Sequence, residues 1–94
     1  MRSRYTAYVL HDEGHLLRTW APERRPHAVS FDPARRWTGL EIVSATDGGL
    51  LASTGSVEFV ARSSTERDDE ALHERSRFRR DDGRWLYVDG DVLP

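Results

Sequence analysis

Apolar residues in the first third of the chain recur at helical spacing, whereas later in the chain they alternate with polar ones. Over 2–11 the spacing predicts a short amphipathic helix, and a second short helix is expected over 15–20. The acidic and glycine residues between these segments interrupt the helical pattern. The segment 22–35 holds three prolines and has no regular period, which predicts a loop with one helical turn at Asp32-Pro33.

The alternating part of the chain predicts an antiparallel meander. Its four strands are expected over 37–46, 55–62, 71–80 and 84–89. Turn sequences separate them, among which are Asp47-Gly48-Gly49 and Asp81-Asp82-Gly83. The second of these turns is expected to be of type I, with Gly83 in the left-handed conformation. Helices followed by a meander predict an α+β protein.

The middle two strands have a register that charge pairing favours. With Phe59 opposite Glu74, Glu58 faces Arg75, and such a pair contributes about 0.2–1 kcal/mol. The ionisable Glu74 then lies on the apolar face of the sheet. That face is expected to carry Val57, Phe59, Ala61, Leu72, Glu74, Ser76 and Phe78, and the outer face His73, Arg75, Arg77 and Arg79.

The length of the last hairpin loop decides which face Trp85 and Tyr87 occupy. A three-residue loop places them with the arginines and a four-residue loop places them with Phe78; we favour the first arrangement. The candidates for an outer binding face are then Glu58, Arg75, Arg77, Trp85 and Tyr87. Such a face could bind single-stranded nucleic acid or an anionic ligand.

The simpler interpretation is that nearby acidic residues neutralise this basic face. The acidic residues near it in the sequence are Glu66, Asp68, Asp69, Glu70, Asp81 and Asp82. A dimer contact or a solvated surface is therefore expected there, and nucleic acid is not an expected partner.

Size and composition narrow the class of protein further. The chain has 94 residues, which makes a single domain over 1–94, and its formal net charge of −2 argues against bulk binding of nucleic acid or anionic membrane. All 14 basic residues are arginine. The absence of cysteine excludes disulfides and thiolate zinc sites. No apolar stretch is long enough for a signal peptide or a membrane span, so a cytoplasmic protein is expected. No cofactor is expected either, since the sequence contains no cofactor-binding motif.

Five blocks of the sequence, in their order, resemble the middle domain of the YchJ-like family. The blocks are MRSRYTAYVLHDEGHLLRTWAPERRP, RWTGLEIV, GSVEFVAR, LHERSRF and DGRWLYVDG, between Met1 and about Val92. The resemblance implies a nuclear transport factor 2-like (cystatin-like) fold, in which N-terminal helices pack on a curved four-stranded antiparallel sheet and leave a cone-shaped pocket. It implies no particular activity. Members of the family usually carry SEC-C zinc-binding motifs, which this chain lacks, so contacts made through such motifs are not carried over.

Within such a cone, the candidate pocket residues are Tyr5, Trp20, Glu74, Ser76 and Phe78. Glu74 is a weak candidate for a catalytic base, because burial can raise the pKa of a carboxyl group toward neutrality. The simpler interpretation is a carboxylate satisfied by Tyr hydroxyls, by Ser76 or by an arginine of the N-terminal helix. No other residue is a catalytic candidate.

The sequence His11-Asp12-Glu13-Gly14-His15 departs from the H-E-x-x-H zinc motif, because Asp12 follows the first histidine and Gly14 interrupts the helix. A solvated turn is expected instead, and no metal. The expected function is a non-enzymatic binding or interaction module, with a second copy of the chain and an unidentified small molecule as its expected partners. The alternative is a small-molecule isomerase or hydrolase that uses a buried Glu in the cone.

Overall fold

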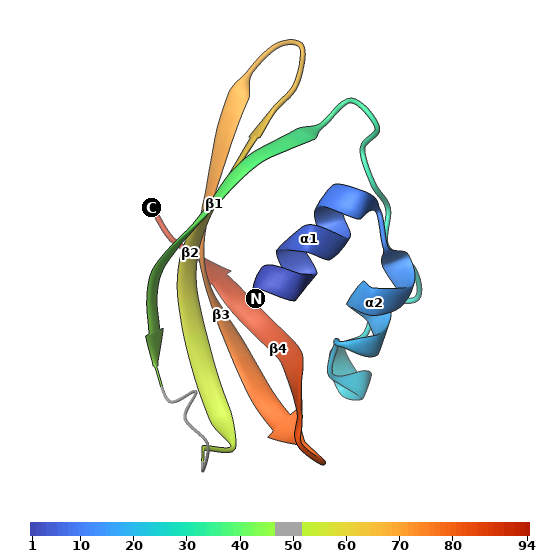
Figure 1. Cartoon of the computed structure of the whole chain (residues 1–94), viewed down its shortest axis with the longest axis vertical. Helices are drawn as coiled ribbons and strands as arrows, with labels where there is room; N and C mark the ends of the chain where they lie inside the picture. Colours follow the sequence, from blue (N-terminus) through green and yellow to red (C-terminus); the bar gives the residue numbers. More distant parts are fainter. Residues whose placement is uncertain (47–51) are drawn as a thin grey trace.

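The computed structural model describes residues 1–46 and 52–94, and it packs the N-terminal helices against one four-stranded antiparallel sheet (Figure 1). The elements are α1 (Arg2–Leu10), α2 (Glu13–Arg18), the short 3-10 helix η1 (Pro22–Arg24), β1 (Arg36–Thr46), β2 (Thr54–Ser64), β3 (Asp69–Asp81) and β4 (Arg84–Val92). The strands follow one another in the order β1-β2-β3-β4. This confirms the α+β class and the meander. The turn predicted at Asp47-Gly48-Gly49 lies outside the described residues.

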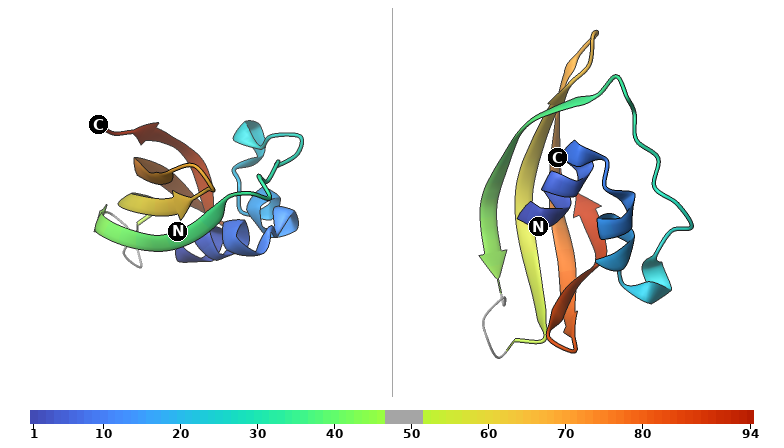
Figure 2. Two further views of the ribbon diagram at one scale, coloured as in Figure 1. Left: turned by 90° about the horizontal axis from the view of Figure 1, so that it is seen from above. Right: turned by 45° about the vertical axis from the view of Figure 1, so that its right-hand side comes forward.

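The sheet is curved, and the helices lie on its concave side (Figure 2). Register shifts in β1 between Trp37 and Gly39 and between Ile42 and Ser44 mark two irregularities in its pairing with β2. Such bulges bend a strand and increase its twist. The bend lets one sheet wrap partly around α1, which places the core between helix and sheet. None of the helices in the described ranges has the length and apolar character that crossing a membrane requires.

The second helix begins earlier than the sequence predicts. His11 takes the left-handed conformation, with φ of 55°, and ends α1. Asp12 then accepts a hydrogen bond from the backbone N–H of His15 at 3.1 Å and thereby caps α2. The helix therefore spans 13–18 instead of 15–20, because the segment expected to be a simple break contains an N-cap.

The residues after α2 pair with the edge strand β4. The backbone N–H of Ala21 donates to the carbonyl of Tyr87, and the N–H of Tyr87 donates to the carbonyl of Thr19, both at 2.7 Å. Trp20 and Tyr87 thus form a parallel bridge, and Trp20 is not helical as predicted. The pairing covers part of an otherwise open sheet edge.

The predicted register between β2 and β3 is confirmed. Phe59 lies opposite Glu74, and Glu58 lies opposite Arg75. The buried apolar side chains between sheet and helices include Ala7, Leu16, Ala21, Phe59, Ala61 and Phe78.

The last hairpin has Gly83 in the left-handed conformation, as predicted, but its loop length and turn type differ from the prediction. Asp82 and Gly83 alone form the loop, and both have positive φ, 50° and 77°, as a type I′ turn requires. A two-residue loop places the side chains of the following strand on the same faces of the sheet as a four-residue loop would. Tyr87 therefore lies opposite Phe78, and Trp85 also lies on the concave face, away from the outer arginines.

Candidate functional site

A cavity of about 220 Å³ lies between α1 and the concave face of the sheet. We call it the inner cavity. It is lined by Met1, Arg4, Tyr5, Tyr8, Trp20, Trp37, Phe59, Ala61, Leu72, Glu74, Ser76 and Tyr87. Most of this wall is aromatic or aliphatic, and its charged side chains are Arg4 and Glu74.

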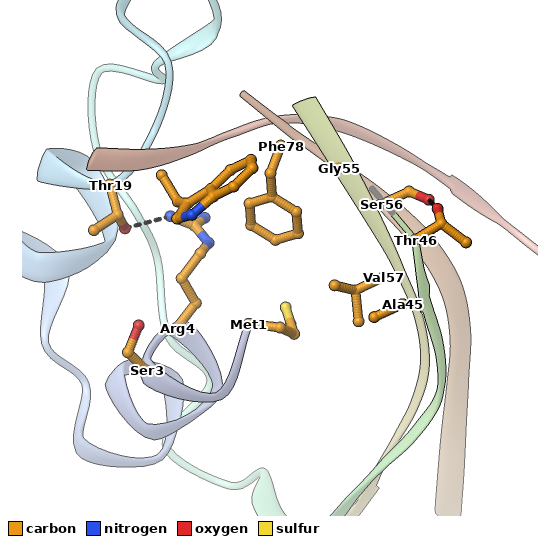
Figure 3. A pocket seen from close by; sticks show the side chains of 11 residues that line it. Met1, Ser3, Arg4, Thr19, Ala45, Thr46, Gly55, Ser56, Val57 and Phe78 are labelled. Carbon is orange, nitrogen blue, oxygen red and sulfur yellow. Dashed lines mark hydrogen bonds between the residues drawn. The ribbon is translucent and has the colours of Figure 1, made fainter. Parts of the chain in front are cut away.

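A second hollow, the outer hollow of about 360 Å³, adjoins the inner cavity and shares Met1 and Arg4 with it. Figure 3 shows Arg4 reaching from α1 toward Thr19, whereas Met1, just before α1, lies facing Phe78 and Val57 of the sheet. Of the pocket residues expected from the sequence, Tyr5, Trp20, Glu74 and Ser76 line the inner cavity. Phe78 lines the outer hollow instead.

Arg4 is a charged residue of the cavity wall that the sequence analysis did not include among the pocket candidates. Its residue surface is only 4% exposed. Its Nη1 donates to the Leu16 carbonyl at 3.0 Å and to Thr19 Oγ1 at 2.7 Å (Figure 3 draws the second bond). The guanidinium carbon lies 4.7 Å from the ring centres of both Trp20 and Tyr87. These contacts fix the cation in a wall of the cavity.

Helical spacing was the signal that could have found Arg4. Positions 1, 4, 5 and 8 share one face of a helix, and this face also carries the aromatic residues Tyr5 and Tyr8. Burial lowers the pKa of Arg4, and the Tyr8 hydroxyl and the Glu74 carboxylate act in the opposite direction. In the described part of the chain, no carboxylate lies within ion-pair distance of Arg4.

Glu74 enters the same cavity from β3. Its Oε2 accepts a hydrogen bond from the Ser76 hydroxyl at 2.7 Å, as residues two apart on one strand face permit. Gly90 of β4 passes close beside this carboxylate, since a Cβ at position 90 would lie 2.8 Å from Glu74 Oε2. Because Gly90 has no side chain, the Glu74 carboxylate fits beside β4.

Tyr87 interacts with both charged groups of the cavity, Arg4 and Glu74. Burial raises the pKa of its hydroxyl to about 12, and the Glu74 carboxylate acts in the same direction. Its ring lies edge-on to Trp20, with ring centres 5.2 Å apart. At neutral pH the Tyr87 phenol is therefore protonated.

Aromatic side chains from distant parts of the chain contact one another in the wall of the inner cavity. Trp37 of β1 lies edge-on to Tyr5, with ring centres 6.0 Å apart, and is tilted against Tyr8 at 6.1 Å. Tyr8 also contacts Phe31 in the loop before β1. The walls are thus rigid rings in contact with one another.

The outer face does not assemble the predicted basic and aromatic surface, because Trp85 and Tyr87 lie on the other side of the sheet. Glu58 accepts hydrogen bonds from His73 at 2.8 Å and from Arg75 at 3.0 Å, and these two partners lower its pKa.

Carboxylates of β4, of η1 and of β3 itself also neutralise the other outer arginines. Arg77 pairs with Asp89 at 2.5 Å and with Asp91 at 2.7 Å. Arg79 pairs with Glu23 and with Asp81. Asp81 is thus the one residue of the predicted acidic set that pairs with an outer-face arginine within the described segments.

The histidines of His11-Asp12-Glu13-Gly14-His15 do not converge. His11 ends α1, is exposed and stacks on Phe31 with ring centres 4.6 Å apart. His15 lies in α2, where its backbone N–H is bound by Asp12. Across residues 1–46 and 52–94 there is no group of three side chains of the types that bind metals.

A curved antiparallel sheet, helices on its concave side and a pocket between them together define a nuclear transport factor 2-like domain. The sequence matches the family described as YchJ, middle NTF2-like domain, over residues 1–90. The chain belongs to this family, as the motif blocks predicted.

Proteins similar to this chain include two UPF0225 proteins. The one from Streptomyces avermitilis is 55% identical over 93 residues, which cover 99% of this chain and 64% of the relative. The one from Streptomyces coelicolor is 52% identical, with 99% and 72% covered. The chain therefore spans about two thirds of the length of these relatives.

A solved structure shares the fold. The solution structure of a SEC-C motif containing protein from Rhodopseudomonas palustris is 34% identical, with a TM-score of 0.82, and covers 100% of this chain and 76% of that one. The agreement supports the arrangement of helices and sheet described above.

Proposed function

We propose that this domain is a non-enzymatic binding module whose inner cavity holds one small molecule. The observation that carries the proposal is a cavity of about 220 Å³ with mainly apolar walls and a few polar groups. Sites for small molecules typically combine these properties. An apolar cavity of about 150 Å³ accommodates benzene, so this one has room for a ring with one or two substituents.

The polar groups support binding more than catalysis. The Ser76 hydroxyl is hydrogen-bonded to Glu74, and the cavity wall, as far as the structure describes it, contains no histidine to activate that serine. Arg4 is held in place by bonds to α2 and by two rings. Groups fixed in this way can orient a ligand.

Filling the cavity tests the proposal. Ala61 is buried in the cavity wall, so Ala61→Leu should occupy the space and abolish binding. Val60→Leu is the matched control, because Val60 lies opposite His73 on the outer face of the same strand. Binding of a library of one-ring compounds would be followed by amide NMR shifts. Lack of any ligand whose shifts map to the cavity, or binding that survives Ala61→Leu, would overturn the proposal.

An isomerase or hydrolase is the second candidate, because Glu74 is a carboxylate inside an apolar cavity. An NMR titration of the Glu74 side chain distinguishes the two functions. A pKa raised toward neutrality, together with turnover that Glu74→Gln removes, would favour the enzyme. An ordinary carboxyl pKa favours the binding module.

The expected homodimer stays a prediction and forms part of the proposal. A small domain has a thin core, and a partner subunit adds stability. Sedimentation equilibrium measures the mass directly, and a stable monomer at all concentrations would contradict it.

A further inference from the structure

We propose that the inner cavity selects small organic acids and that Arg4 binds their carboxylate. The inference rests on the proposed function and names the class of molecule bound. It is carried by a buried guanidinium in a cavity wall that has no carboxylate partner among the described residues.

The first step is the contrast between Arg4 and the surface arginines. Arg75, Arg77 and Arg79 are more exposed, and each pairs with a carboxylate. Arg4 is 4% exposed and has two neutral acceptors and two ring faces in place of a counter-ion. A buried charge is costly unless it is paired. An anion in the cavity would complete this pairing.

The second step is the supply of hydrogen-bond donors. A guanidinium has five N–H donors, and the bonds from Arg4 to Leu16 of α2 and to Thr19 both use Nη1. The Tyr8 hydroxyl also interacts with this guanidinium, and the remaining donors on Nε and Nη2 can make the planar, two-point contact that a carboxylate makes with arginine. Arg4 lines both the inner cavity and the outer hollow, so a ligand can approach it from the open side.

The third step limits the charge and shape of the ligand. Glu74 lines the same cavity, so a dianion such as phosphate would be repelled more strongly than a monoanion. The Glu74 carboxylate can instead accept a hydrogen bond from a ligand hydroxyl or amine. Aromatic walls and the volume fit one ring. The ligand class is thus a one-ring carboxylic acid that carries a hydrogen-bond donor.

The test compares an acid with its neutral analogue. Binding of 4-hydroxybenzoate and of 4-hydroxybenzamide to the intact chain would be measured by tryptophan fluorescence, since Trp20 lies against Arg4. The acid is expected to bind at least about tenfold more tightly, as a charge-assisted pair implies. Arg4→Met should remove this preference. Arg2→Met is the matched control, because Arg2 is exposed on the same helix and loses the same charge.

Arg4 also holds α2, so the folding of Arg4→Met would be checked by amide NMR. If that variant does not fold, Arg4→Lys decides the question, because it keeps the charge but loses the two-point contact, and the preference for the acid should fall without disappearing. An amide that binds as tightly as the acid, or inorganic phosphate that displaces the acid at equal concentration, overturns this inference and leaves the proposed function standing. If no one-ring compound, charged or neutral, binds in the cavity, the proposed function fails and this inference fails with it.

Discussion

Arg4 and Glu74 give the inner cavity its chemical character. Arg4 comes from α1 and Glu74 comes from β3. Both charges act on the Tyr87 hydroxyl, whose pKa burial raises to about 12. Neither charge is on the outer surface. Electrostatic interactions are stronger in such an apolar setting than in water, so small changes around either group should be measurable.

Gly90 provides a test of this packing. In Gly90→Ala the new Cβ would lie 2.8 Å from Glu74 Oε2 and 3.1 Å from the Arg75 carbonyl oxygen. The variant is expected to lose about 1–3 kcal/mol of unfolding free energy, as crowded core positions do, and to displace the Glu74 side chain. Urea unfolding measures the loss. Gly39→Ala is the control, because a Cβ there meets nothing within 4 Å, and equal stability of both variants would contradict the prediction.

At the scale of elements, the connection from α2 to β1 is tied to the sheet at several points. Thr19 and Ala21 pair with Tyr87 of β4, and Glu23 of η1 binds Arg79 of β3 through both carboxylate oxygens. Without these contacts, α1 and α2 would be joined to the sheet mainly through side chains. The ties therefore hold the cavity closed on the β4 side.

The ion pair of Glu23 predicts how stability depends on acid. The Arg79 guanidinium lowers the pKa of Glu23 from 4.5 to about 2. Between these values the unfolded chain binds more protons, so this contribution to stability is present above pH 4.5 and is lost as the pH falls toward 2. Urea unfolding across this range should show a steeper loss for the natural chain than for Glu23→Gln. Parallel curves would show that the pair adds no stability.

At the scale of the molecule, the two faces of the sheet have different roles. The helices lie on the concave face (Figure 1), and the inner cavity lies between α1 and this face. The outer face presents arginines whose charges are balanced by Glu58, Asp89 and Asp91 from neighbouring strands. The outer charges therefore satisfy one another, whereas the inner cation does not have such a partner among the described residues.

This balance predicts that the outer face does not bind nucleic acid. Binding to phosphates needs cations that are not already paired and aromatic rings beside them, and Trp85 and Tyr87 are on the other face. A fluorescent single-stranded oligonucleotide should show no change in anisotropy with the protein at low salt. Binding that weakens as salt rises would contradict this prediction.

The sequence by itself determined the order of elements and the register of β2 against β3, because alternation of apolar and polar residues and the Glu58–Arg75 pair are local patterns. It also placed Glu74 and Ser76 on the apolar face. It misplaced Trp85 and Tyr87, because one residue of loop length reverses the face and the acidic turn sequence fits either length.

Only the tertiary structure decided the composition of the cavity. Arg4 is a polar position in a short helix, and nothing near it in the sequence shows that Thr19, Trp20 and Tyr87 will surround it. These partners are brought together by the bridge between the α2 connection and β4, a contact between segments far apart in the chain. Burial of a charge is a property of the assembled fold, so its functional meaning could be recognised only there.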